Sequence, residues 1–276
     1  MFDLLYCPHS KKMNVGAEVL NDVLSRSLFG NNTAAFKNSL PMLILSYSLY
    51  NWLSFTSSYF LTALLSYYLI FDKKFMKRPL YRNNQIKDEI TLSTTSIIWL
   101  CPIVALIFIP YRYEGRHLLS WKYCGVFKEL KAIVIVLVLA DFLLYWFHRL
   151  LHENRFMYKQ IHKLHHQFVI PTPFASYAFH PLENLINGLP YLMAGYYVEM
   201  HHVTFLALIV VSHCSAFNVH EGDFKLYKFL NPYLIDANFH SKHHYLFTKN
   251  YGHITTLWDR LSQTCEMEDY KLVSSD

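Results

Sequence analysis

Residues 148–166 read HRLLHENRFMYKQIHKLHH, which places five histidines within nineteen positions. This stretch directly follows the apolar run AIVIVLVLADFLLYWF at residues 132–147. A later group, HSKHH at residues 240–244, has similar histidine spacing. Histidines three or four positions apart lie on one face of a helix, with Cβ atoms roughly 5–6 Å apart. The pattern therefore predicts a helix that can hold a metal ion at the end of an apolar segment.

The composition of the 276-residue chain, 53% hydrophobic and 17% aromatic, favours a membrane protein. A spanning helix needs roughly 20 apolar residues. The long apolar stretches are residues 39–71, 92–110, 130–147 and 184–219. The first is too long for one upright helix, so we expect it to be strongly tilted, partly interfacial or a tight helical pair. The expected fold class is all-α, a polytopic membrane helical bundle with a cytosolic helical cap that holds a histidine-rich di-metal site.

The stretch 184–219 is interrupted near its middle by a glutamate and two histidines, which predicts a helical hairpin that enters the membrane and returns. Such a hairpin would bring His180, before it, and His220, after it, to the same face. The expected parts of the chain are an N-terminal segment (1–38), transmembrane helices (39–147) and a catalytic histidine region that includes the hairpin (148–276).

Two basic regions suggest how the chain is oriented in the membrane. Residues 72–90 contain six lysines or arginines, and residues 148–163 are also basic. If each apolar stretch between them crosses once, the two regions share a side, which the positive-inside rule makes cytosolic. The first twenty residues lack the pattern of a cleaved signal peptide, so we expect the first membrane segment to direct targeting. If the first apolar stretch also crosses the membrane once, a glycosylation sequon at Asn31 would be lumenal and could be glycosylated.

Cysteine usage argues against a disulfide-rich or thiolate-metal protein, and the net charge argues against a nucleic-acid-binding protein. The five cysteines form no CxxC pair, which argues against a disulfide framework or a thiolate metal site. The formal charge of +5 is modest, and the basic residues lie beside apolar segments. These residues are typical of anchoring at a membrane surface rather than of nucleic-acid binding.

Ten histidines are expected on one membrane face, more than the three or four ligands of a single zinc ion, and they suggest two metal ions. These candidate ligands are His148, His152, His162, His165, His166, His180, His220, His240, His243 and His244. His213 lies two helical turns before His220, and its role is left open. The remaining histidines are interpreted as ordinary surface residues: His9, His117, His201, His202 and His253.

Four carboxylates near these histidines are candidates for accepting a hydrogen bond from a ligand imidazole. Asp141 lies inside an apolar stretch, seven residues before His148, where an ionisable group is costly. It either orients a ligand ring or is a helix-pairing or snorkelling residue. Glu221, Asp223 and Asp259 admit the same two interpretations.

The boxes HxxxH, HxxHH and a late HxxHH resemble the membrane fatty acid hydroxylase and sterol desaturase superfamily. The phrases PTPFASYAFHPLENLINGLPY, HEGDF and NYGHITTLWDR are similar to its C-5 sterol desaturase branch, the lathosterol oxidases. The resemblance extends from about residue 60 to about residue 264. The sequence departs from the family pattern at Glu221, where aspartate is usual, and at Phe239, where a further histidine is usual.

The resemblance implies an oxygen-dependent enzyme of the endoplasmic reticulum membrane that converts a Δ7-sterol into a 5,7-diene. It implies a non-haem di-iron centre facing the cytosol, ligated by the eight box histidines, with His180 and His220 as the ninth and tenth ligands. Electrons would come from NADH through a reductase and cytochrome b5, which could dock near Lys159 and Lys163. The sterol would enter sideways from the membrane.

Two other functions remain open from the residues alone. A hydroxylase of sterol methyl groups, fatty acids or sphingolipids would use the same metal site. A membrane metal transporter would also be rich in histidine, but its ligands should lie near the middle of the membrane. Here the histidines lie outside the apolar stretches, which favours the enzyme.

Overall fold

The computed structural model describes residues 15–30, 36–114, 119–120, 123, 125–221 and 232–267. Asn31 and Asp223 lie outside these residues. The described elements are α1 (Val15–Phe29), α3 (Leu40–Leu69), η3 (Lys73–Lys77), α4 (Gln85–Glu114), β1 (Leu119–Ser120), α5 (Val126–Glu153), α6 (Arg155–Met157), η4 (Tyr158–His162), α7 (Lys163–His166), η5 (Pro173–Tyr177), α8 (Pro181–Tyr197), β2 (Met200–His201), α9 (His202–Asn218), α10 (Ala237–Leu246) and α11 (Leu257–Leu261). Because β1 and β2 form only a short parallel pair, the expectation of an all-α protein is confirmed.

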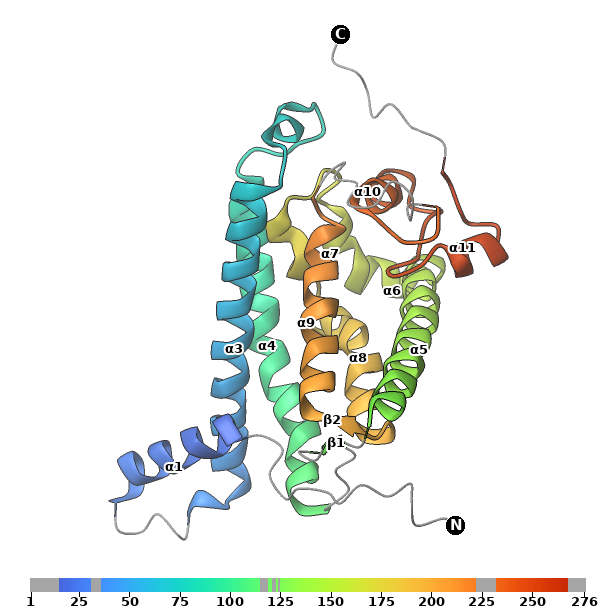
Figure 1. The fold of residues 1–276 in the computed structure, drawn as a ribbon. Coiled ribbons are helices and arrows are strands. Elements are labelled where there is room, and N and C mark those ends of the chain that lie inside the picture. The colour runs from blue at the N-terminus through green and yellow to red at the C-terminus, as the bar shows by residue number, and fades with distance from the viewer. Residues whose placement is uncertain are drawn as a thin grey trace.

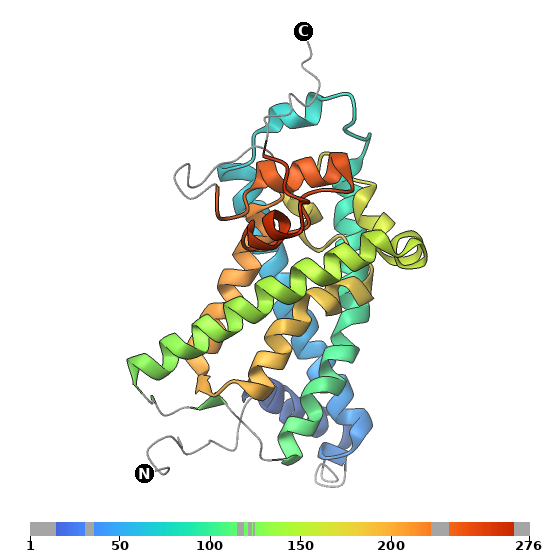
Figure 2. The same cartoon turned by 90° about the vertical axis from the view of Figure 1, so that its right-hand side faces the viewer.

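Long helices form a bundle, and short helices cover one of its ends. Figure 1 shows α3, α4, α8 and α9 running along the bundle, with β1 and β2 at one end and α10 and α11 at the other. Figure 2 shows α5 crossing the bundle obliquely toward the end that carries the short helices. The basic segment around η3 lies at this same end (Figure 1), so the two basic regions share a side as expected.

In the part of the chain that the structure describes, two helices have the length and hydropathy of membrane-spanning segments, Gln85–Ile109 within α4 and Val126–Glu153, which is α5. The outer face of α5 is apolar, and Leu130, Val134 and Val138 are each more than half exposed. An exposed apolar face of this kind is matched to lipid. The two apolar helices and the exposed apolar face of α5 are the features of a membrane protein.

The stretch expected at residues 39–71 forms one continuous helix, α3, rather than a tight pair of helices. Its 30 residues correspond to about 45 Å of helix. Serine, tyrosine and asparagine recur along α3, which is not among the described helices that have the hydropathy of a membrane span. The stretch expected as a hairpin forms two 17-residue helices, α8 and α9, joined through β2.

A buried stripe on α5 determines where the histidines lie. Every fourth residue from Ala132 to Leu144 is buried, and the stripe packs against α8 and α9 around Tyr191 and Leu208. Residues four apart lie on one helical face, so the stripe continues into His148 and His152. The face that packs the bundle therefore also points these two rings at its covered end.

Candidate metal centre

The first five candidate histidines come from the end of α5 and from two short elements that follow it, η4 and α7. α5 ends at Glu153, because the Asn154 side chain accepts hydrogen bonds from the N–H groups of Phe156 and Met157 and starts a new helix. The chain then forms the π-helical turn η4, which carries His162, and α7, which carries His165 and His166. π-helical turns are frequent at functional sites.

The remaining histidines approach from the C-terminal part of the chain. Asp236 caps α10 by accepting a hydrogen bond from the N–H of Phe239 at 2.9 Å. This helix presents His240, His243 and His244 toward α5 and α7. His220 follows the end of α9, and its ring lies 4.8 Å from that of His240, measured between centroids.

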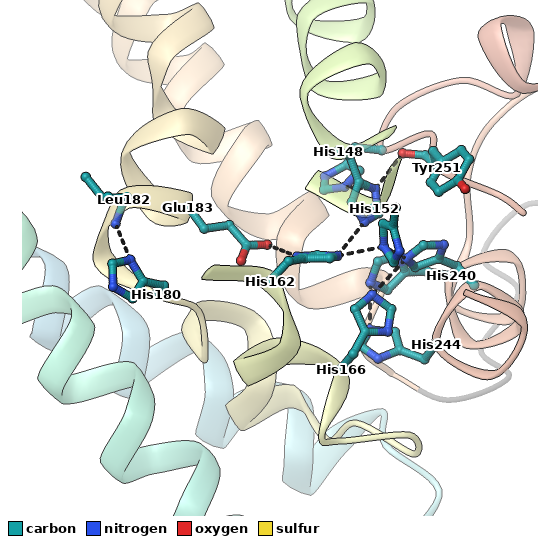
Figure 3. A network of polar contacts seen from close by, with 12 residues as sticks. His148, His152, His162, His166, His180, Leu182, Glu183, His240, His244 and Tyr251 are labelled. Carbon is teal, nitrogen blue, oxygen red and sulfur yellow. Dashed lines mark hydrogen bonds and ion pairs between the residues drawn. The ribbon is translucent and has the colours of Figure 1, made fainter. Parts of the chain in front are cut away.

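Nine of the ten predicted histidines gather into two groups, and Figure 3 shows several of them, among them His148, His162 and His244, close together. Within each group, one nitrogen per ring lies within 4.8 Å of every other. The five-histidine group is His148, His152, His162, His166 and His243, and the four-histidine group is His165, His220, His240 and His244. The groups adjoin, because the ring centroids of His166 and His244 are 4.7 Å apart.

The hydrogen bonds of the outer ring nitrogens fix the tautomers of several rings. Nδ1 of His148 lies 2.8 Å from the carbonyl oxygen of Tyr251, and Nδ1 of His243 lies 2.7 Å from that of Lys249. A carbonyl oxygen only accepts, so each Nδ1 carries the proton and each neutral ring has its lone pair on Nε2. His162 is oriented the same way by the Glu183 carboxylate, 2.6 Å from Nδ1.

The inner nitrogens therefore face one another as lone pairs. Nε2 of His148 and Nε2 of His162 are 3.2 Å apart, with no proton available between them in these tautomers. Two lone pairs at this distance repel unless a cation lies between them. Nitrogens about 2.1 Å from one ion lie about 3.0–3.4 Å apart in octahedral or tetrahedral geometry, so this contact fits a shared metal ion.

Burial keeps the imidazoles neutral, which is the form that binds metal. It lowers the pKa of His220 to about 4, because the charged ring would lose its water. Burial also lowers the pKa of His165 and His243 well below the usual value, and the neighbouring rings of His220 and His152, respectively, lower it further. Imidazole donors suit first-row transition ions such as iron, zinc and copper. The donor set fits a metal site, as the sequence predicted.

His180 is not brought to either group. Its Nδ1 accepts a hydrogen bond from the N–H of Leu182 at 3.2 Å and caps α8. Figure 3 shows His180 on the far side of Glu183 from the other histidines. His213 also lies elsewhere, with its ring nitrogens 3.0 Å from Oγ1 of Thr62 and 2.9 Å from the hydroxyl of Tyr177.

His253 is not the ordinary surface residue that its isolated position suggested. Its Nε2 lies 3.0 Å from Nδ1 of His148, and burial lowers its pKa to about 4. Its place in NYGHITTLWDR, one of the family-like phrases, was the available signal. Because His253 lies outside the histidine boxes in the sequence, its position gave no reason to connect it with His148.

The predicted carboxylates that the structure describes accept hydrogen bonds from backbone N–H and hydroxyl groups rather than from imidazoles. Asp141 accepts hydrogen bonds from the N–H and hydroxyl of Thr255. Asp259 accepts from the N–H groups of Tyr251 and Gly252 at 2.9 and 2.7 Å, and so holds the loop whose carbonyl orients His148. Two of the predicted carboxylates therefore support the site through this loop.

Glu221 and Glu183 differ in what they contact. Glu221 accepts from the Ser66 hydroxyl at 2.5 Å. Among the described residues, Glu183 is the carboxylate that contacts an imidazole of either group, and it is not one of the four carboxylates predicted from the sequence. Its position three residues after His180 gave a weak signal, since only the packing of α8 brings it to His162.

Comparison with known proteins identifies the family. The profile of the fatty acid hydroxylase family matches residues 133–264. A lathosterol oxidase from Homo sapiens is 38% identical over 207 residues, which cover 74% of this chain and 69% of that protein. The chain belongs to the lathosterol oxidase family of sterol desaturases. A Delta(7)-sterol 5(6)-desaturase from Candida dubliniensis is 33% identical over 255 residues, which cover 90% of this chain and 63% of that protein.

No solved structure matches the chain at a significant level. The expected family and class of enzyme, an oxidoreductase, are confirmed by its membership of the lathosterol oxidase family. The matched range 133–264 includes every histidine of the two groups. The metal centre is therefore part of the region that defines the wider hydroxylase family.

Proposed function

We propose that this chain is a sterol C-5 desaturase that converts a Δ7-sterol into a 5,7-diene in sterol biosynthesis. The observation that carries the proposal is the pair of adjoining histidine groups, in which the lone pairs of His148 and His162 face each other, in a member of the lathosterol oxidase family. The reaction balances when the sterol loses two hydrogens while dioxygen, two electrons and two protons yield two waters.

The nine gathered histidines would hold two non-haem iron ions. Bound iron would supply the redox chemistry with dioxygen that no amino-acid side chain provides. The chain itself keeps the imidazoles neutral, orients them through their outer nitrogens and surrounds them with apolar groups. The ring centroid of Phe179 lies 4.1 Å from that of His165, so an aromatic wall flanks the four-histidine group and helps to exclude water.

We propose that the sterol reaches this wall laterally from the membrane, and that the catalytic region comprises residues 148–276. The bundle end carrying the histidines would face the cytosol from the endoplasmic reticulum membrane. Exposed Lys159 and Lys163 lie at this end, and a basic surface would attract an acidic electron donor. Cytochrome b5, reduced from NADH by its reductase, is the donor that we propose.

A lipid hydroxylase would use the same centre, and the chain matches the fatty acid hydroxylase family. The test must therefore distinguish hydroxylation from desaturation. A transporter is disfavoured, because its ligands should lie within the spanning helices rather than at their end.

The test is expression in a host that lacks its own C-5 desaturase and accumulates a Δ7-sterol. The proposal expects aerobic formation of the 5,7-diene, read by its ultraviolet absorption and a mass two hydrogens lower. A product heavier by one oxygen, without any diene, would establish the hydroxylase instead.

A further inference from the structure

The two histidine groups differ in a carboxylate contact, which the five-histidine group makes through His162. Oε1 of Glu183 lies 2.6 Å from Nδ1 of His162, and the side chains of the two residues are 2% and 1% exposed. Glu183 occupies the first turn of α8, where the helix dipole favours a carboxylate, whereas burial raises the pKa of this group well above its usual value. Figure 3 shows its side chain directed at the His162 ring, away from the inner nitrogens of the group.

The outer nitrogens of the four-histidine group are held less firmly. Nδ1 of His220 donates to the carbonyl oxygen of Ala216 at 2.7 Å. Nδ1 of His244 is buried without a hydrogen-bond partner among the described residues. In the five-histidine group two carbonyls and the Glu183 carboxylate fix three of the five rings, although Nδ1 of His166 also lacks a partner among the described residues.

An acceptor on the outer nitrogen orients a ligand ring, fixes its tautomer and raises its basicity, and a carboxylate does so more strongly than a carbonyl. We propose that Glu183 is a positioning residue for His162, and that it makes the five-histidine group the tighter of two unequal metal sites. This inference rests on the metal centre of the proposed function. It adds that the four-histidine group releases its ion first.

The test measures metal retention rather than turnover. The full chain in detergent is loaded with Co²⁺ and dialysed against increasing concentrations of a chelator, and the cobalt per chain and its visible absorption are recorded. Wild-type protein should release cobalt in two steps with different spectra. His162→Ala should abolish the tighter step and His220→Ala the weaker one, which assigns each step to a group.

Glu183→Gln keeps the shape of the side chain and removes its charge. It should weaken the tighter step about 10- to 100-fold, the usual effect of losing such a partner, and leave the weaker step in place. Glu221→Gln is the matched control, because Glu221 is also buried beside a candidate ligand but contacts Ser66. This control should release cobalt as the wild type does.

Two results would overturn the inference: equal retention of both ions in wild type, or unchanged release by Glu183→Gln. If the Gln variant lost its helical circular dichroism, Glu183→Asp would replace it. This variant keeps the charge but withdraws it from His162, and should shift the same step in the same direction. A wild-type chain that bound no cobalt would instead contradict the metal centre of the proposed function.

Discussion

The Nδ1 atom of His148 lies 2.8 Å from the carbonyl oxygen of Tyr251, although 103 positions separate the two residues in the chain. The loop that carries Tyr251 is held by Asp259, which accepts hydrogen bonds from the N–H groups of Tyr251 and Gly252. A ring on α5 is thus oriented by a loop near the C-terminus, so the loop backbone contributes to the metal centre as directly as a side chain would.

Gly252→Ala should damage the site through this loop. A Cβ at position 252 would lie 2.7 Å from the carbonyl oxygen of Thr255 and 2.8 Å from Oδ2 of Asp259, closer than van der Waals contact allows. Overpacking of this kind costs about 1–3 kcal/mol. We expect a lower midpoint of thermal unfolding and a lower metal content per chain, measured together in detergent.

Gly188→Ala is the matched control for this substitution. Position 188 lies within α8, and nothing lies within 4 Å of a Cβ added there. Alanine favours a helix over glycine by about 1 kcal/mol, so this variant should be as stable as wild type or slightly more stable. Equal unfolding midpoints and equal metal contents in the two variants would contradict a role for this loop in the metal centre.

His180→Asn tests the separation of His180 from the metal groups. Asparagine is a favourable N-cap, so it can replace the hydrogen bond that His180 accepts from the N–H of Leu182. We expect unchanged metal content and unfolding temperature, whereas His162→Asn should lose metal. Loss of one ion from His180→Asn, in elemental analysis, would make His180 the tenth ligand that the sequence suggested.

The stability of the metal-free chain should fall in mild acid. Burial lowers the pKa of His220 to about 4 in the folded chain, while a histidine in the unfolded chain titrates near 6.5. Between these values the unfolded state binds more protons, so the free energy of unfolding decreases as the pH falls. From pH 7 to pH 5, His220 alone should contribute a loss of about 2 kcal/mol.

Denaturant unfolding in excess chelator at the two pH values measures this loss. His220→Gln should remove the share due to His220 and leave a smaller pH dependence from the other buried rings. Equal or greater stability of the metal-free wild type at pH 5 would show that these rings are not buried as neutral groups.

The sequence predicted the histidine groups because their spacing is local. His148 and His152 are one turn apart on α5, the first HxxHH box runs from the end of η4 through α7, and the second lies on α10, so helical periodicity brings the rings of each box close together. The all-α bundle and the hairpin also followed from runs of apolar residues. These features depend on neighbours within a few positions.

What the sequence did not predict depends on packing between distant elements. Glu183 meets His162 only because α8 packs beside η4, and His253 meets His148 across 105 positions. The path of the first apolar stretch was also undetermined, since composition does not distinguish one long helix from two short ones. Continuous helical hydrogen bonding in α3 resolves it.

The most direct test of the central claim, that nine histidines form two metal sites, is the iron content of the purified chain. Elemental analysis after gentle purification and reconstitution with Fe²⁺ should give two ions per chain. His162→Ala, which breaks the five-histidine group, and His220→Ala, which breaks the four-histidine group, should each retain about one ion. One ion or none in the wild type, or two ions in both variants, would contradict the claim.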